Sequence, residues 1–168
     1  LDSWTTPFGV PPFAAIETAH YRPAFEAALA AHVREIAAIA ENPEPPSFSN
    51  TIDAFERSGH ALDRIASVFF NLTGAHTNDE LDAIETEIAP KFSRHYSAIY
   101  LNDALFARID AIAKAAPADL TDEQKRVLER YHTAFIRSGA GRPAEVKERI
   151  AAISERLASL GTNFGQNV

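Results

Sequence analysis

Apolar side chains recur at helical spacing along most of the chain, and the widest stripe lies between residues 48 and 74. Its members are Ile52, Phe55, Leu62, Ile65, Phe69 and Leu72. Residues three, four or seven apart share one face of an α-helix. Ser49 and Asn50 are residue types that cap a helix start, and Gly74 stands where a C-terminal cap would end the helix. The pattern therefore predicts a long central helix with neighbours packed around it.

The same periodicity predicts five further helices. They run over 21–41, over 78–100, from Asn102 to Pro117, from Thr121 to Ser138, and from Val146 to Phe164. Thr77 with Glu80, and Thr121 with Gln124, have the spacing of a capping box. Pro90 interrupts the second of these helices, so we expect a kink there or a split into two. The last two helices are joined by a short link, which predicts an antiparallel hairpin.

Residues 1–20 differ from the rest of the chain because Pro7, Pro11 and Pro12 interrupt any helical stripe. Proline lacks an amide donor and restricts the residue before it, so we expect an extended arm. Its aromatic residues are expected to anchor the arm against the helices, with an aromatic ligand site as the alternative. They are Trp4, Phe8 and Phe13. Residues 21–168 then form an all-α domain of about six helices in an antiparallel, bundle-like array.

Composition excludes several classes of protein. There is no Cys, which excludes disulfides, thiolate metal sites and a Cys nucleophile and suits a reducing compartment, so we expect a cytoplasmic protein. The net charge of −7 argues against nucleic acid as a partner, because phosphate neutralisation needs clustered Lys and Arg. No apolar run approaches the roughly 20 residues that a membrane helix needs.

The candidate metal ligands are six histidines: His20, His32, His60, His76, His95 and His132. A helical zinc site of the His-Glu-x-x-His type needs two His four apart, with a Glu between them to activate water. No two histidines here lie three or four apart. We therefore expect no catalytic, cofactor-binding or metal-binding residue in this chain, with a site assembled from distant His as the alternative.

Two histidines have individual expectations. His95 lies beside Tyr96 on the apolar stripe of 78–100, which predicts a hydrogen-bonded core residue. His76 lies in the turn after Gly74, where a local capping role is expected and contact with a substrate or partner is the alternative. The chain has neither a Gly-x-Ser-x-Gly nucleophile motif nor a Gly-rich phosphate loop.

Four separated segments carry a family resemblance. They are Val-Phe-Phe-Asn-Leu-Thr-Gly-Ala-His-Thr-Asn-Asp-Glu-Leu at 68–81, His-Tyr-Arg-Pro-Ala-Phe at 20–25, Glu-Ile-Ala-Ala-Ile-Ala at 35–40, and 99–108 with Ile-Tyr-Leu-Asn and Leu-Phe-Ala-Arg. In this order and spacing the chain resembles the amino-terminal part of bacterial peptidyl-dipeptidases (dipeptidyl carboxypeptidases). These belong to the thimet-oligopeptidase-like family of zinc metallopeptidases.

The resemblance implies a function for a longer protein. The whole enzyme would have two mostly helical lobes around a deep cleft and would release dipeptides from the carboxyl end of short peptides. Its zinc would sit on a His-Glu-x-x-His helix and a later Glu, all downstream of Val168. This fragment would wall the cleft without catalytic residues and would bind no zinc, and its partners would be the missing C-terminal catalytic region and short peptide substrates.

The chain also has features of a fragment. It has no Met, at position 1 or elsewhere, and no clear stop signal after the last helix. We expect a piece of a longer enzyme, and a processed or designed small protein is the alternative. As alternatives in function, the chain is a free-standing helical scaffold or a regulatory binding module.

Overall fold

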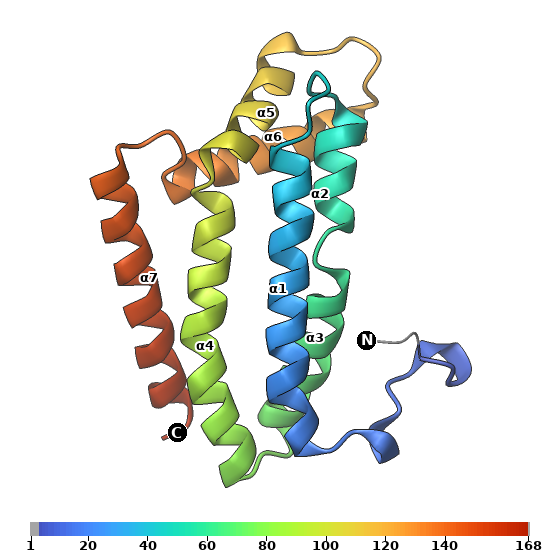
Figure 1. Ribbon diagram of the computed structural model, residues 1–168, viewed down its shortest axis with the longest axis vertical. Coiled ribbons are helices and arrows are strands. Elements are labelled where there is room, and N and C mark those ends of the chain that lie inside the picture. The colour runs from blue at the N-terminus through green and yellow to red at the C-terminus, as the bar shows by residue number, and fades with distance from the viewer. Residues whose placement is uncertain (1–3, 168) are drawn as a thin grey trace.

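The computed structural model describes residues 4–167, and within them the chain is helical and has no β-strand. Six helices have thirteen residues or more, and one is a single turn (Figure 1). They are α1 (Tyr21–Ala40), α2 (Ala54–Arg57), α3 (His60–Ala75), α4 (Asp79–Tyr100), α5 (Asp103–Ala115), α6 (Asp122–Ser138) and α7 (Ala144–Gly165). The predicted all-α fold is confirmed. No helix in this part of the chain is long and apolar enough to cross a membrane.

The helices pack around two hydrophobic clusters. α1 lies beside α3 and α4, and α7 runs along the other side of α4, while α5 and α6 cross one end of this array (Figure 1). One cluster joins α1, α3 and α4 around Phe25, Phe69 and Ile84. The second joins the far ends of α1 and α4 to α5 and α6, around Ile109 and Phe135. α1 and α4 contribute to both clusters, so these two helices form the spine of the fold.

The predicted central helix is wrong as one continuous element. A π turn, Phe48–Asp53, leads into α2, and the chain leaves the helix at Ser58 before α3 begins. Ser47 caps the start, accepting a hydrogen bond from the Asn50 amide, in place of the predicted Ser49. Gly74 does not end α3 either, because it lies within the helix. The break places the Gly59 amide against Glu35 of α1.

Most other predicted helix boundaries are confirmed, with a change in one cap. Asn102 caps α5, and Thr121 caps α6 through the predicted box with Gln124. At α4 the cap is Asn78, whose side chain accepts from two amides, and the predicted Thr77 box is wrong. Pro90 does not split α4, which is one continuous helix.

The predicted hairpin of the last two helices is wrong. Gly139 has a left-handed conformation and ends α6, as expected of a glycine at this position. The chain then turns away, and α7 packs lengthwise against α4 while α6 crosses the end of the array (Figure 1). Lys147 of α7 pairs with Asp103 at the start of α5, and Arg94 of α4 pairs with Glu155 of α7 at 2.6 Å.

The amino-terminal arm, described from Trp4 onward, combines extended residues with three short 3-10 turns, Pro7–Gly9, Phe13–Ala15 and Thr18–His20. Residues 1–3 of the predicted arm lie outside the described residues. Trp4 anchors the arm as predicted, because its ring packs on the first cluster under the Arg64 guanidinium, 5.0 Å from the ring centroid. Phe8 is fully exposed, so its predicted anchoring role is wrong.

Candidate functional site

The structure brings two of the six histidines together and leaves the other four in separate places. His20 accepts a hydrogen bond from the Glu17 amide, and His60 is exposed at the start of α3. His76 occupies the C-cap of α3, the local role expected for it. His132 of α6 contacts Asp110 of α5 at 3.0 Å. Among residues 4–167 there is no group of three or more His, Cys, Asp or Glu with the geometry to hold a metal ion.

The buried pair consists of His32 and His95. The buried positions of α1 are Tyr21, Phe25, Ala28, His32, Ile36 and Ile39. His32 therefore lies in the middle of the buried face, four positions after Ala28 and four before Ile36. His95 lies on the buried face of α4, so its predicted core position is confirmed. Val33, the apolar residue next to His32 in sequence, is exposed instead, so apolar periodicity alone does not identify His32 as a core residue.

A chain of hydrogen bonds links α4, α1 and the break after α2. His95 Nε2 lies 2.9 Å from His32 Nδ1, His32 Nε2 lies 3.2 Å from Ser58 Oγ, and Ser58 Oγ donates to the Phe55 carbonyl at 2.7 Å. Because the Ser58 hydroxyl donates to that carbonyl, His32 Nε2 must be the donor to Ser58 Oγ. Its Nδ1 is then an acceptor, and His95 donates from Nε2. With both imidazoles neutral, every hydrogen bond in this chain, from His95 through His32 and Ser58 to the Phe55 carbonyl, has one donor and one acceptor.

Burial favours this neutral state. Desolvation by burial, together with a smaller effect of the neighbouring His32, lowers the pKa of His95 to about 4. Desolvation also lowers the pKa of His32. The negative charges of the Glu35 and Asp63 carboxylates raise this pKa, but by less than desolvation lowers it. At neutral pH the pair is therefore an uncharged link between the two long helices of the spine.

The turn at Ser58 and Gly59 is shaped by His32. Gly59 has a φ of 74°, a left-handed conformation that suits glycine. A Cβ built on Gly59 would lie 2.7 Å from His32 Cε1, so a side chain at this position would collide with the imidazole. The Gly59 amide donates to Glu35 Oε2 of α1 at 2.7 Å. This contact explains why the helix predicted across 48–74 breaks here.

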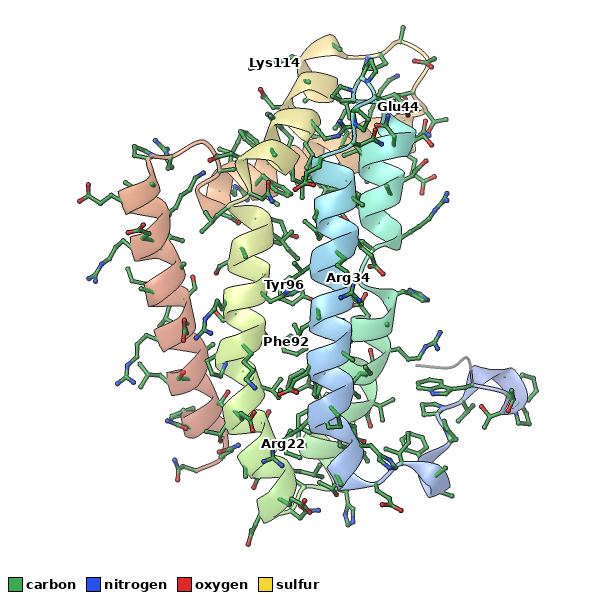
Figure 2. The ribbon with its side chains drawn as sticks, in the orientation of Figure 1. Arg22, Arg34, Glu44, Phe92, Tyr96 and Lys114 are labelled. Carbon is green, nitrogen blue, oxygen red and sulfur yellow. The ribbon has the colours of Figure 1, made fainter. Side chains whose placement is uncertain are left out.

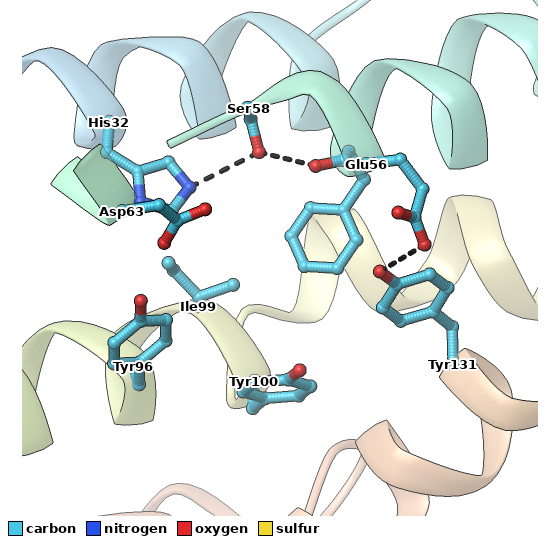
Figure 3. Close-up of a pocket in the computed structure, with 9 residues that line it drawn as sticks. His32, Glu56, Ser58, Asp63, Tyr96, Ile99, Tyr100 and Tyr131 are labelled. Atoms are coloured by element: carbon cyan, nitrogen blue, oxygen red, sulfur yellow. Dashed lines mark hydrogen bonds between the residues drawn. The ribbon is translucent and has the colours of Figure 1, made fainter. Parts of the chain in front are cut away.

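A cleft of about 210 Å³ opens beside this turn (Figure 3). Its lining residues are His32, Phe55, Glu56, Ser58, Asp63, Tyr96, Ile99, Tyr100 and Tyr131. The carboxylates of Glu56 and Asp63 are the only charged side chains in this lining at neutral pH. Tyr131 of α6 donates its hydroxyl to Glu56 at 2.6 Å, and its ring packs edge-on against Phe55. The cleft thus offers carboxylate oxygens, phenol groups and aromatic faces contributed by four helices.

The tyrosines of the cleft stay protonated at neutral pH. Burial raises the pKa of Tyr131, and its hydrogen bond to Glu56 raises that pKa further. Burial likewise raises the pKa of Tyr96 and of Tyr100. All three phenols are therefore hydrogen-bond donors under ordinary conditions.

The contact between His32 and Ser58 has the residue types of a nucleophile and its base, but the surroundings give it a structural role. The Ser58 proton is directed at a backbone carbonyl of its own turn. The other nitrogen of His32 faces a second neutral imidazole, where nucleophilic Ser–His sites place a carboxylate. The Gly59 amide, which lies next to the hydroxyl along the chain, is already bonded to Glu35. These contacts fix the turn against α1.

Arg108 of α5 is a second buried polar residue that the sequence analysis missed. Its guanidinium donates to the carbonyls of Asn42 and Glu44 at 2.8 and 3.1 Å, and to Asn50 Oδ1 at 2.9 Å. It also contacts Thr51 Oγ1 at 3.3 Å. The side chain therefore holds the Pro-rich link after α1 and the π turn against α5. The planar guanidinium group can donate to several acceptors at once. Because these acceptors all belong to the link and the π turn, the role of Arg108 is structural.

The chain is similar in sequence to bacterial peptidases. It is 39% identical over 165 residues to dipeptidyl carboxypeptidase of Escherichia coli (strain K12), covering 98% of this chain and 24% of that protein. The enzyme of the same name from Salmonella typhimurium is 38% identical over 169 residues, covering 100% of this chain and 25% of that protein. Oligopeptidase A of Salmonella typhimurium is 28% identical over 97% of this chain and 24% of its own length. No protein-family model matches the chain.

These matches have one feature in common. Each covers nearly the whole of this chain, and the region matched is the amino-terminal part of the relative. The chain spans about a quarter of the length of these relatives. The resemblance noted at the four sequence segments is thereby confirmed.

Proposed function

Because this chain is similar over nearly its whole length to the amino-terminal region of bacterial dipeptidyl carboxypeptidases and oligopeptidases A, we propose that it is a non-catalytic helical part of a longer peptidase. The observation that carries the proposal is the coverage. The similarity spans this chain but only about a quarter of the relatives. Most of a related enzyme, with room for its catalytic residues, therefore lies outside the matched region.

In this proposal the chain walls the substrate cleft and leaves the chemistry to the rest of the enzyme. The family resemblance implies zinc, which would polarise the scissile carbonyl and activate water. The residues described here do not fit that metal. Nδ1 of His32 and Nε2 of His95 point at each other, and residues 4–167 supply no third ligand beside them. The zinc ligands of the enzyme would therefore follow this chain, and no step of the reaction is assigned to its residues.

Peptide cleavage by two purified proteins tests the proposal. One is the 168-residue chain, and the other is the longer polypeptide encoded by the same gene. We expect the longer polypeptide to release dipeptides from the carboxyl end of short peptides, as detected by mass spectrometry, and to lose this activity with a chelator. We expect the 168-residue chain to release none. Chelator-sensitive cleavage by the pure 168-residue chain would refute the proposal.

A second candidate function is a free-standing helical scaffold or regulatory module that binds a partner. It is favoured by large apolar side chains that α7 leaves exposed, such as Leu157 and Phe164. The codons after Val168 separate the two functions. A stop codon in the natural gene favours the scaffold, whereas several hundred further codons with a His-Glu-x-x-His motif favour the peptidase.

A further inference from the structure

α7 has an apolar stripe that no other described part of the chain covers. Its exposed members are Val146, Ile153, Leu157, Leu160 and Phe164. The last four follow one another at steps of four, three and four, so they lie on one face of the helix. Leu157 is 62% exposed and Phe164 is 73% exposed. No residue of this 22-residue helix is fully buried, in contrast with every other long helix of the fold.

A different face of α7 contacts α4. Glu155 pairs with Arg94 there, and Gln166 donates to the Asp82 carbonyl at 2.9 Å. Glu155 and Gln166 are eleven residues apart, about three turns, so they share a face. Leu157 and Leu160 stand two and five positions from Glu155, which turns them away from that face. α7 thus has one face for α4 and a second, apolar face that stays free.

The free face borders the largest of the described clefts. α3 and α7 both pack on α4, and about 500 Å³ lies between their carboxyl-terminal ends. Phe70 and Gly74 of α3 form one wall, and Gly161 and Gly165 of α7 form the other. Gly161 comes four positions after Leu157 and three before Phe164, so on the helix surface it adjoins these two residues of the stripe. Side chains at Gly74, Gly161 or Gly165 would meet nothing within 4 Å, so the walls leave room for a neighbouring backbone.

Aromatic residues extend this surface on the α3 and α4 side. Phe70 is partly exposed, and its ring stacks edge-on against Phe92 of α4 with 5.8 Å between centroids. Phe92 in turn packs against Phe25 of α1 and Tyr96 of α4 (Figure 2). Phe70 therefore extends the first hydrophobic cluster to the edge of the cleft.

We propose that this surface, made of the α7 stripe and Phe70, is the docking site for an amphipathic helix from the part of the same polypeptide that follows this chain. The inference rests on the proposed function. The length of the relatives supports this occupant, because they are about four times as long as the region matched here. An apolar stripe of five large side chains is more than a monomeric protein ordinarily leaves in water. Burial of this stripe would stabilise the longer protein and fix α7 on its lobe.

One double substitution, made in two proteins, tests the inference. Leu157→Asp with Leu160→Asp is introduced into the 168-residue chain and into the longer polypeptide. In the short chain both side chains face water, so we expect the melting temperature (Tm) to change by less than about 2 °C. In the longer polypeptide the carboxylates would be buried against an apolar helix, so we expect the Tm to fall by at least about 4 °C.

A matched control uses the polar face of the same helix. Ala152→Asp with Arg156→Asp adds the same residues to α7 at exposed positions outside the stripe. We expect the Tm of both proteins to change by less than about 2 °C with this pair. Circular dichroism of all variants checks that α7 remains helical.

The outcomes separate this inference from the proposed function. If the stripe variant leaves the longer polypeptide as stable as the control does, the docking site is wrong, whether or not that polypeptide cleaves peptides. If the longer polypeptide lacks peptidase activity but the stripe variant still destabilises it, the docking site stands and the proposed function falls. If the short chain is a dimer that the stripe variant dissociates, while the longer polypeptide is unaffected, the occupant is a second copy and the inference is overturned.

Discussion

His32 Nδ1 of α1 lies 2.9 Å from His95 Nε2 of α4, at the level where the two hydrophobic clusters meet. Both side chains are less than a tenth exposed. A buried polar group is costly unless it is hydrogen-bonded, and here each imidazole satisfies the other. The pair therefore fixes the register of the two spine helices, and Ser58 extends this constraint to the break between α2 and α3.

We first predict that the chain becomes less stable at acidic pH because of His95. The pKa of His95 is about 4 in the folded chain against 6.5 for an ordinary histidine, so the unfolded chain binds more protons between these two values. The free energy of unfolding should therefore be highest above pH 6.5 and should fall as the pH drops towards 4, by on the order of 2 kcal/mol for this residue. Urea unfolding followed by circular dichroism at pH 7, 6 and 5 measures the decrease.

Two variants check that the histidine pair causes this decrease. His95→Leu removes the titrating group, so we expect a less stable protein at pH 7 whose loss of stability between pH 7 and 5 is smaller. His60→Gln removes an exposed histidine and should keep the pH dependence of the parent chain. Equal pH dependence in all three proteins would show that the buried pair is not responsible.

The second prediction concerns two glycines. Gly59→Ala places a Cβ at a φ of 74° and 2.7 Å from His32 Cε1, so we expect a loss of about 1–3 kcal/mol in the free energy of unfolding. Gly74→Ala, in the helical backbone of α3 with no atom within 4 Å of the new Cβ, should instead stabilise the chain by about 0.5–1 kcal/mol. Chemical denaturation of both variants measures the two values. A Gly59→Ala chain as stable as the parent would contradict the close contact with His32.

The third prediction separates a buried arginine from an exposed one. Arg108→Met leaves the carbonyls of Asn42 and Glu44 without their donor, so we expect a loss of about 2–4 kcal/mol. Arg94→Met breaks the pair with Glu155 at the surface, where water screens the charges, so it should leave the stability close to that of the parent chain. Both are measured by denaturant titration at neutral pH. Arg108→Lys should not restore the parent value, because one ammonium group cannot reproduce the planar fork. Full rescue by lysine would indicate that only the charge matters.

The sequence predicts the helices well because periodicity and caps are local properties. The stripe of Leu81, Ile84, Ile88 and Ile99 is buried as its spacing implies, and Asn102 and Thr121 cap the helices assigned to them. The break at Gly59 could not be predicted in this way. Glycine is required there because a side chain would collide with His32, which is 27 positions away in sequence and on another helix. A glycine within a helical stripe is ambiguous until the neighbour that requires it is known.

The arrangement of the helices was harder to predict than their bounds. A short link between α6 and α7 favours a hairpin, yet α7 packs on α4 because its contact face, with Glu155 and Gln166, matches groups on that helix. Most of the apolar stripe of α7 faces water. Periodicity identifies the apolar face of a helix, but it does not tell which polypeptide covers that face.

The fourth prediction compares two neighbouring phenylalanines of α3. Phe69 is completely buried, with its ring edge-on to Phe25 and Tyr21 at 5.2 and 5.0 Å between centroids. Phe69→Ala should leave a cavity in the first cluster and cost about 3–5 kcal/mol in the free energy of unfolding. Phe70 is 37% exposed and borders the cleft beside α7, so Phe70→Ala should cost about 1 kcal/mol in the 168-residue chain.

The longer polypeptide provides the second half of this comparison. If a docked helix covers Phe70 there, Phe70→Ala should lower the Tm of the longer polypeptide by an amount closer to that of Phe69→Ala. Differential scanning calorimetry of both variants in both proteins gives the four values. A cost for Phe70→Ala that stays small in the longer polypeptide would mean that this side chain remains in water, and the docking surface would then be limited to α7.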